Sequence, residues 1–193
     1  MFDKIPPICA MNCHYRFYTL EYFFRSARDN GYKEVEIWTG PMHYYVDCRV
    51  RENISKLLDL ENQYQIKVIG ICPEQTNPKP NNIAALSEEG QIRTLNYFKN
   101  EIDAAKLVKA NQVVITSGWG YLDQPIQLSW NSSVQMLRKI SEYAEQQGIP
   151  LAIEALQKKE SNLVHTAAEL KRLIADVDRP ALKVCLDIGA MAA

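Results

Sequence analysis

Several absences limit the kind of protein that this sequence encodes. No apolar run approaches the roughly 20 residues that a membrane-spanning helix requires. Basic residues are not in excess, since 22 Lys and Arg stand against 23 Asp and Glu for a net charge of −1, and this balance argues against an electrostatic binder of nucleic acid or membranes. The first residues, MFDKIPPICAMNCHYRF, lack the basic and then apolar layout of a signal peptide. We therefore expect a cytoplasmic protein with no nucleic-acid or membrane partner.

Histidine is scarce, with three residues, and the five cysteines lie at irregular spacing without a C-x-x-C pair. Structural zinc sites and disulfide frameworks depend on regular spacing, so we expect reduced and mostly buried thiols. Two nucleotide-binding motifs are also missing: no G-x-G-x-x-G follows the first predicted strand, and no G-x-x-x-x-G-K-S/T occurs. Their absence excludes the main nucleotide-binding forms of a doubly wound sheet.

The sequence does contain a regular alternation of short apolar strands with longer amphipathic segments. Strands are predicted at 5–11, 34–38, 66–71, 112–116, 149–155 and 182–187. Between them, apolar residues recur every three or four positions, which is typical of helices that pack one face on a core. Strict alternation indicates parallel strands with right-handed crossovers, so the sheet is either doubly wound or part of a (β/α)₈ barrel.

Local signals mark where some of these helices begin and end. The motif DNG at 29–31 and Gly148 each predict a helix end, because glycine adopts the left-handed backbone conformation readily. The motif TAAE at 166–169 predicts a capping box at a helix start. No linker or change of composition divides the chain, and we predict one domain over residues 1–193.

Ligands bind at the carboxyl ends of the strands in both architectures, so the residues that close each strand are the candidates for a site. Glu154 and Asp187 stand out because each follows an apolar run. A carboxylate in such a place loses hydration and requires compensation. Compensation by a core Lys or Arg, or a helix-capping role, is one interpretation. The other is that the two carboxylates bind one divalent cation.

At this point the sequence resembles a known family. The segment IPLAIEALQKKESN (149–162), followed by LDIGA (186–190), is similar to the sugar isomerase/epimerase superfamily with xylose-isomerase-like barrels. NGYKEVEIW (30–38) matches the same superfamily, and the closest resemblance is to ketose 3-epimerases and the fructoselysine 3-epimerase type. The resemblance implies an α/β TIM barrel and a metal-dependent isomerase or epimerase of small sugars or sugar phosphates. The resemblance further implies that such an enzyme abstracts a proton from a carbon next to a carbonyl, through an enediolate.

The resemblance also implies roles for individual residues. Such enzymes hold the metal with four side chains, and Glu154 and Asp187 match the first two, from strands five and six. Glu154 would also be the catalytic acid and base, and Glu160 would hydrogen-bond sugar hydroxyls. The cofactor expected is Mn²⁺, with Mg²⁺, Co²⁺ or Zn²⁺ as alternatives. The other two ligands, a His and a Glu, belong to strands seven and eight.

Four residues on the strand-end loops are further candidates for substrate binding: His14, His43, Trp38 and Trp119. The two imidazoles would bond a hydroxyl, and the two indoles would stack on a sugar ring, although surface exposure or packing explains each equally well. A His that contacts substrate in relatives is replaced here by Ala190, which changes the expected sugar contact.

A barrel usually takes about 250 residues, so the chain would supply six of eight strand-helix units. We expect about 80 further residues in the natural protein. The exposed edges of an incomplete barrel also predict a homo-oligomer. Two alternatives stay open: a non-catalytic sugar- or inositol-binding barrel or inactive remnant, and an endonuclease-IV-like DNA-repair enzyme. The latter requires many more histidines than three.

Overall fold

The structure, a computed structural model, describes residues 8–75 and 80–191. Its sheet has six parallel strands in the order of the sequence: β1 (Ala10–Met11), β2 (Glu34–Trp38), β3 (Lys67–Cys72), β4 (Gln112–Ile115), β5 (Leu151–Glu154) and β6 (Leu182–Cys185). A doubly wound sheet reverses its strand order at a switch point, whereas sequential order is that of a barrel. The predicted TIM-barrel type is therefore confirmed, with β1 and β6 as the two edges among the described residues.

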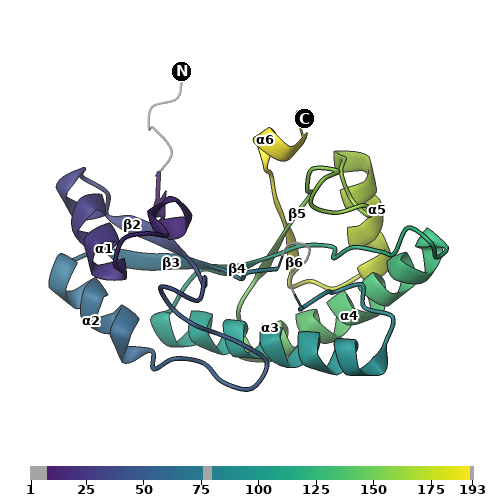
Figure 1. Cartoon of the computed structure of the whole chain (residues 1–193), viewed down its shortest axis with the longest axis horizontal. Coiled ribbons are helices and arrows are strands. Elements are labelled where there is room, and N and C mark those ends of the chain that lie inside the picture. Colours follow the sequence, from purple (N-terminus) through teal and green to yellow (C-terminus); the bar gives the residue numbers. More distant parts are fainter. Residues whose placement is uncertain (1–7, 76–79, 192–193) are drawn as a thin grey trace.

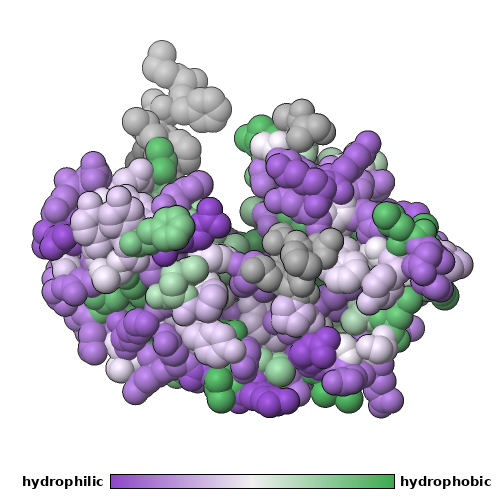
Figure 2. All heavy atoms as spheres, viewed as in Figure 1, coloured by the Kyte–Doolittle hydropathy of each residue, from purple (hydrophilic) through white to green (hydrophobic). Residues whose placement is uncertain are grey.

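Two helices follow β1, and one helix follows each of the other five strands. They are η1 (Asn12–Tyr15, a 3-10 helix) and then α1 (Leu20–Asp29), α2 (Ser55–Tyr64), α3 (Glu88–Val108), α4 (Ile126–Gln147), α5 (Ala167–Val177) and α6 (Ile188–Met191). Helices α1 to α5 lie along the outer side of the curved sheet (Figure 1). The space-filling view shows a notch between the side of the molecule that holds α1 and the side that holds α5 and α6 (Figure 2). Among the described residues, no helix is long and apolar enough to span a bilayer.

Strand β2 shows how the sequence divides its side chains between the two faces of the sheet. Val35 and Ile37 are fully buried in the hydrophobic core, which the helices cover. Glu36 and Trp38 alternate with them and are half-buried, because they point to the inner face of the curved sheet. The same alternation places Glu154, the last residue of β5, on the inner face.

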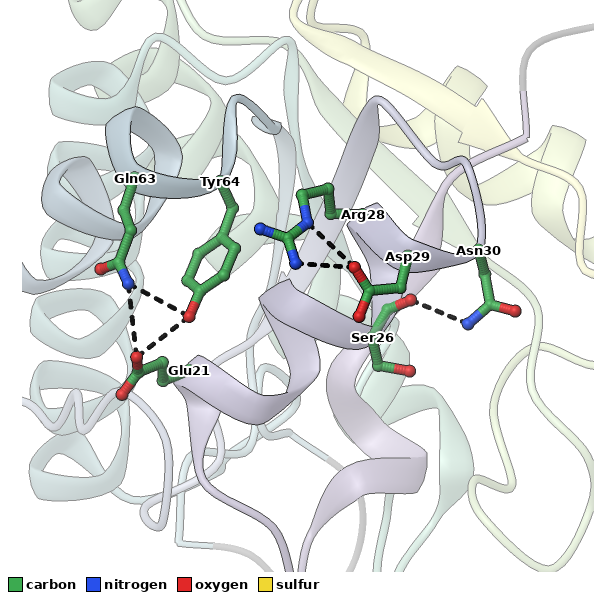
Figure 3. Close-up of polar contacts among 7 residues, drawn as sticks. All are labelled: Glu21, Ser26, Arg28, Asp29, Asn30, Gln63 and Tyr64. Atoms are coloured by element: carbon green, nitrogen blue, oxygen red, sulfur yellow. Dashed lines mark hydrogen bonds and ion pairs between the residues drawn. The ribbon is translucent and has the colours of Figure 1, made fainter.

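Helices α1 and α2 pack together on the outer side of the first strands. Phe23 and Phe24 of α1 are fully buried. On the exposed side, Glu21 accepts a hydrogen bond from the hydroxyl of Tyr64 at 3.0 Å and a longer one from Gln63 Nε2 at 3.4 Å (Figure 3). Arg28 pairs with its neighbour Asp29 (Figure 3), and its guanidinium also lies over the ring of Tyr64 on α2, 5.2 Å from the ring centroid.

The helix-end predictions are confirmed. Thr166 and Glu169 form the reciprocal capping box at the start of α5. Gly31 and Gly148 follow α1 and α4 with φ of +84° and +72°. The first predicted strand, 5–11, ends at Met11 as expected, because the chain turns into η1 at residue 12. Its start was less accurate: Ile8 and Cys9 are not part of β1, which contains Ala10 and Met11. Residues 5–7 of this prediction lie outside the described part of the chain.

Helix α3 buries most of the apolar face that its spacing predicts. Phe98, Ile102 and Ala105 are fully buried, whereas Ile92 on the same side is exposed, and the polar side chains of Thr94 and Glu101 are fully buried as well. This helix of 21 residues packs on both β3 and α4, so polar residues lie inside its contact surface.

Candidate active site at the carboxyl ends of the strands

The structure brings Glu154 and Asp187 to the same end of neighbouring strands. Glu154 pairs in register with Cys185 across the parallel strands β5 and β6. Asp187 lies two residues beyond Cys185 and thus continues the same face of the chain. The two carboxylates are close enough that the charge of Asp187 raises the pKa of Glu154.

Glu154 lies in a setting that disfavours its ionised form. Burial raises the pKa of this carboxyl to about 7, and the negative charges of Asp187, Glu36 and Glu160 add to the rise. Within residues 8–75 and 80–191 it has neither a hydrogen-bond donor nor a cationic partner. The interpretation that a core Lys or Arg compensates Glu154 is therefore not what the described structure shows.

Asp187 does have a structural role. Its Oδ1 accepts a hydrogen bond from the backbone N–H of Ala190 at 2.9 Å, and its carbonyl accepts one from Met191 at 3.0 Å. The helix-capping interpretation thus holds for Asp187. This cap occupies one carboxylate oxygen, so Oδ2 stays without a protein partner among the described residues.

A third carboxyl group, Glu36, lies on the inner face of the sheet below Glu154. Its Oε2 accepts a weak hydrogen bond from Gln112 Nε2 at 3.4 Å, and burial raises the pKa of Glu36. Gly70, opposite Glu36 in the register, leaves the space for this side chain, since a Cβ at Gly70 would lie 2.7 Å from Glu36 Oε2. Glu36 thus has a hydrogen-bonding role within the sheet, with Gln112 as its partner.

The donor set suits a hard divalent cation only in part. Among the described residues, no group of three or more His, Cys, Asp or Glu side chains is arranged to hold a metal. The pair Glu154 and Asp187 supplies carboxylate oxygens, which Mg²⁺ and Mn²⁺ prefer. Cys185 is a poor further ligand, because burial and the nearby carboxylates raise the pKa of its thiol to about 11. All five cysteines are free and half-buried.

Glu160 and Trp119 meet at the loops that follow β5 and β4, where they line the same pocket. Glu160 Oε2 accepts a hydrogen bond from the backbone N–H of Gln157 at 3.2 Å. The indole N–H of Trp119 is buried without a hydrogen-bond partner among the described residues. Trp119 also packs edge-on against Tyr121, with ring centroids 5.4 Å apart.

The remaining substrate-binding candidates, His14, His43 and Trp38, differ in their exposure and in their contacts. His14 is exposed on η1. His43 is fully buried; its Nδ1 accepts a hydrogen bond from Asn12 Nδ2 at 2.8 Å, and its Nε2 lies 2.9 Å from the carbonyl of Tyr18. Both nitrogens of His43 are therefore used inside the protein, and this geometry gives no support to a sugar contact. The ring of Trp38 lies over Gly40, whose missing Cβ would come within 2.2 Å of it.

Four side-chain amides at the strand ends, which we call the rim amides, were missed by sequence reasoning: Asn12, Gln75, Asn82 and Asn162. Each pairs its amide N–H and carbonyl with the backbone at the end of a neighbouring strand: the next strand for Asn12, Gln75 and Asn82, and the preceding strand for Asn162. Asn12 and Asn82 bond both N–H and C=O of Trp38 and Trp119, respectively. Asn162 does so with Gly120, at 2.7 and 2.9 Å. Gln75 bonds Val114 and Thr116.

Comparison with known proteins agrees with this geometry. Residues 24–193 match the family model described as xylose isomerase-like TIM barrel. Fructoselysine 3-epimerase of Shigella flexneri is 33% identical over 179 residues, which are 92% of this chain and 64% of that protein. The enzyme of the same name from Escherichia coli O157:H7 is 32% identical over the same share. The chain thus spans 64% of the length of these relatives.

Solved structures show the same fold at lower sequence identity. A 3-keto-D-glucoside 4-epimerase from E. coli superposes with a TM-score of 0.79 at 18% identity, covering 96% of this chain and 70% of that one. D-psicose 3-epimerase from Clostridium cellulolyticum H10 gives a TM-score of 0.72 at 19% identity, covering 89% and 59%. These structures show the shared fold, and the match of the family model over residues 24–193 shows that the chain belongs to the xylose isomerase-like TIM barrel family.

Proposed function

We propose that this chain forms the greater part of a metal-dependent epimerase of ketoses that exchanges the proton at C3, with fructosamine adducts such as fructoselysine among its substrates. The observation that carries the proposal is that the carboxylates of Glu154 and Asp187 lie near each other at the carboxyl ends of β5 and β6. The identity to two fructoselysine 3-epimerases supports the choice of reaction and substrate class.

Two side chains of this chain would hold the metal. Glu154 would bind it with its carboxylate, and Asp187 would bind it through Oδ2. When it is bound, the cation supplies charge stabilisation for the enediolate that forms next to the ketose carbonyl. Manganese is our first choice of ion, with Mg²⁺, Co²⁺ or Zn²⁺ as alternatives, because the two ligands are hard oxygen donors. The capping bond from Ala190 fixes the orientation of the Asp187 carboxylate.

Glu154 would take the proton from C3 as general base and hold it on a carboxylate oxygen. A base works best when its carboxylate is available but weakly solvated, which is the setting of this half-buried side chain. Glu160 would accept hydrogen bonds from sugar hydroxyls, with Trp119 alongside. Inversion at C3 requires an acid on the opposite face of the sugar, and we assign no residue of this chain to that role.

Metal binding is tested by titrating Mn²⁺ alone and following the heat of binding. We expect binding to the wild-type protein, and a loss of at least about tenfold in affinity for Glu154→Gln and for Asp187→Asn. Glu142→Gln, an exposed substitution on α4, is the matched control and should bind as the wild type does. Equal affinity in all four proteins would refute the assignment of these two ligands.

The reaction is tested in D₂O by NMR. Deuterium should enter C3 of D-fructose or fructoselysine with the wild-type protein, and Glu154→Gln should abolish this exchange while Glu142→Gln retains it. Sugar binding without exchange in the wild type would instead indicate a non-catalytic sugar-binding barrel. A DNA-repair endonuclease is not supported, since no group of three metal-binding side chains, histidines included, forms within the described part of the chain.

A further inference from the structure

A second pocket lies beside the proposed catalytic carboxylates, between the loop after β4 and the loop after β5. Its volume is about 170 Å³. The lining residues are Trp119, Gly120, Leu122, Lys158, Lys159, Glu160, Ser161 and Asn162. Neither the metal nor the proton transfer proposed above uses the two lysines or Leu122.

Hydrogen bonds between the two loops fix the walls of this pocket. Asn162 bonds both the N–H and the carbonyl of Gly120. Ser161 is buried, and its hydroxyl donates to the carbonyl of Gly118 at 2.6 Å. Asn82 holds Trp119 from the other side. The pocket is therefore a built part of the strand-end face rather than a gap between loose loops.

The charges around the pocket are distributed unevenly. Lys158 and Lys159 are exposed, and neither ammonium forms an ion pair within the described part of the chain. On the inner side, Glu154 and Asp187 are carboxylates with no cationic partner among the described residues. A ligand that spans both regions meets positive charge at its outer end and the proposed metal site at its inner end.

Glu160 connects the two regions. It lines the pocket, and its negative charge contributes to the raised pKa of Glu154. The side chains of Trp119 and Leu122 add apolar surface to the lining, and Leu122 is 93% exposed. From the inside of the site outward, a ligand would thus meet the carboxylates of Glu154 and Asp187, then Glu160. Beyond them lie the apolar surface of Trp119 and Leu122 and the ammonium groups of the two lysines.

We infer that this pocket is a subsite for the substituent of a modified ketose, and that it receives an aliphatic chain ending in a carboxylate. A lysine adduct of fructose has this form, with the sugar at one end of a methylene chain and an α-carboxylate, next to an α-ammonium, at the other. The methylene groups pack on Trp119 and Leu122, and the carboxylate binds Lys158 and Lys159. This inference rests on the proposed function, which supplies the position of the sugar.

Binding of two ligands of the same shape tests the subsite. The probes are fructoselysine and its α-carboxamide, which lacks the negative charge, titrated calorimetrically in the presence of Mn²⁺. We expect the wild-type protein to bind the carboxylate about tenfold more tightly than the amide. In the double variant Lys158→Ala/Lys159→Ala this ratio should fall to about one, and added salt should lower it in the wild type. Lys139→Ala, an exposed lysine on α4, should keep the wild-type ratio.

Equal affinity for acid and amide in the wild type, or an undiminished preference in the double variant, would overturn the subsite. Fructose 6-phosphate is the third probe, because a phosphate is also anionic. If it binds more tightly than fructoselysine and the lysine substitutions remove that advantage, the pocket takes a phosphate and the carboxylate assignment is wrong. Deuterium exchange at C3 of unmodified D-fructose separates the two proposals, since it reports on the reaction and does not involve the substituent.

Discussion

Glu101 of α3 is a carboxyl group that the proposed reaction does not use. It is fully buried, and its Oε1 accepts a hydrogen bond from Thr39 Oγ1 at 2.7 Å, whereas Oε2 has no partner among the described residues. Burial raises the pKa of Glu101 to about 8, because it outweighs the hydrogen bond from Thr39 and the positive charge of Arg51, which both lower the pKa. The group is therefore protonated in the folded protein at neutral pH.

This burial predicts a pH dependence of stability. The unfolded chain ionises Glu101 near pH 4.5, whereas the folded chain holds the proton until about pH 8. The contribution of the neutral group to stability is complete below pH 4.5 and declines as the pH rises to 8, by up to about 4 kcal/mol. Glu101→Gln should remove this decline, as measured by urea unfolding across that range. Glu142→Gln should leave it unchanged, and an equally steep decline in Glu101→Gln would contradict the assignment.

The space at Gly70 predicts a coupled pair of substitutions. Gly70→Ala places a Cβ 2.7 Å from Glu36 Oε2, and we expect it to cost about 1–3 kcal/mol of unfolding free energy. In a Glu36→Ala background the same change should cost much less, because the obstructing carboxyl group is gone. Chemical denaturation of the four proteins measures this coupling. Additive costs would show that Glu36 does not fill the space at Gly70.

At the scale of elements, α5 depends on its reciprocal cap. Thr166 Oγ1 accepts from the N–H of Glu169 at 3.2 Å, and Glu169 Oε2 accepts from the N–H of Thr166 at 3.0 Å. Thr166→Ala should lower the unfolding free energy by about 0.5–2 kcal/mol. Thr166→Ser keeps the accepting oxygen and should retain most of this unfolding free energy, as measured by urea unfolding. If serine and alanine are equally destabilising, the hydroxyl contributes nothing as a cap.

Elements whose signals are local were predictable from the sequence. Thr166, Gly148 and the strand EVEIW at 34–38 appear where they were expected. The burial of Glu101 on α3 was not predictable, because it depends on Thr39, which lies 62 positions away in the sequence. The rim amides were missed for the same reason: Asn12 bonds a residue 26 positions away, and nothing in its local sequence marks that partner.

For the site, the order of the strands was sufficient to place Glu154 and Asp187 together, because parallel strands bring their carboxyl ends to one edge. Their predicted roles as metal ligands stay proposals. The burial of His43 could not be predicted from the sequence. Its partner Asn12 lies 31 positions away, and no local pattern distinguishes a buried loop histidine from an exposed one.

At the scale of the whole molecule, the edge strand β6 predicts self-association. Val184 is 48% exposed, and Leu186 and Ile188 follow it with 70% and 79% exposure. An unpaired parallel edge with apolar side chains favours pairing with another chain. We expect the sedimentation coefficient of the 193-residue chain to rise with concentration. Val184→Lys should reduce this rise, whereas Val50→Lys, an exposed apolar position away from the sheet, should not. Concentration-independent sedimentation as a monomer would contradict the proposed homo-oligomer.

The rim amides have a consequence for how the mouth of the barrel responds to its surroundings. Asn12, Gln75, Asn82 and Asn162 bind the backbone with groups that carry no net charge and do not titrate. Order at the strand ends therefore does not depend on ionic strength or on acidity, as it would with ion pairs. The amides also bring no cation that would compete with a metal for the carboxylates, so the negative charge of these carboxylates stays available to a ligand.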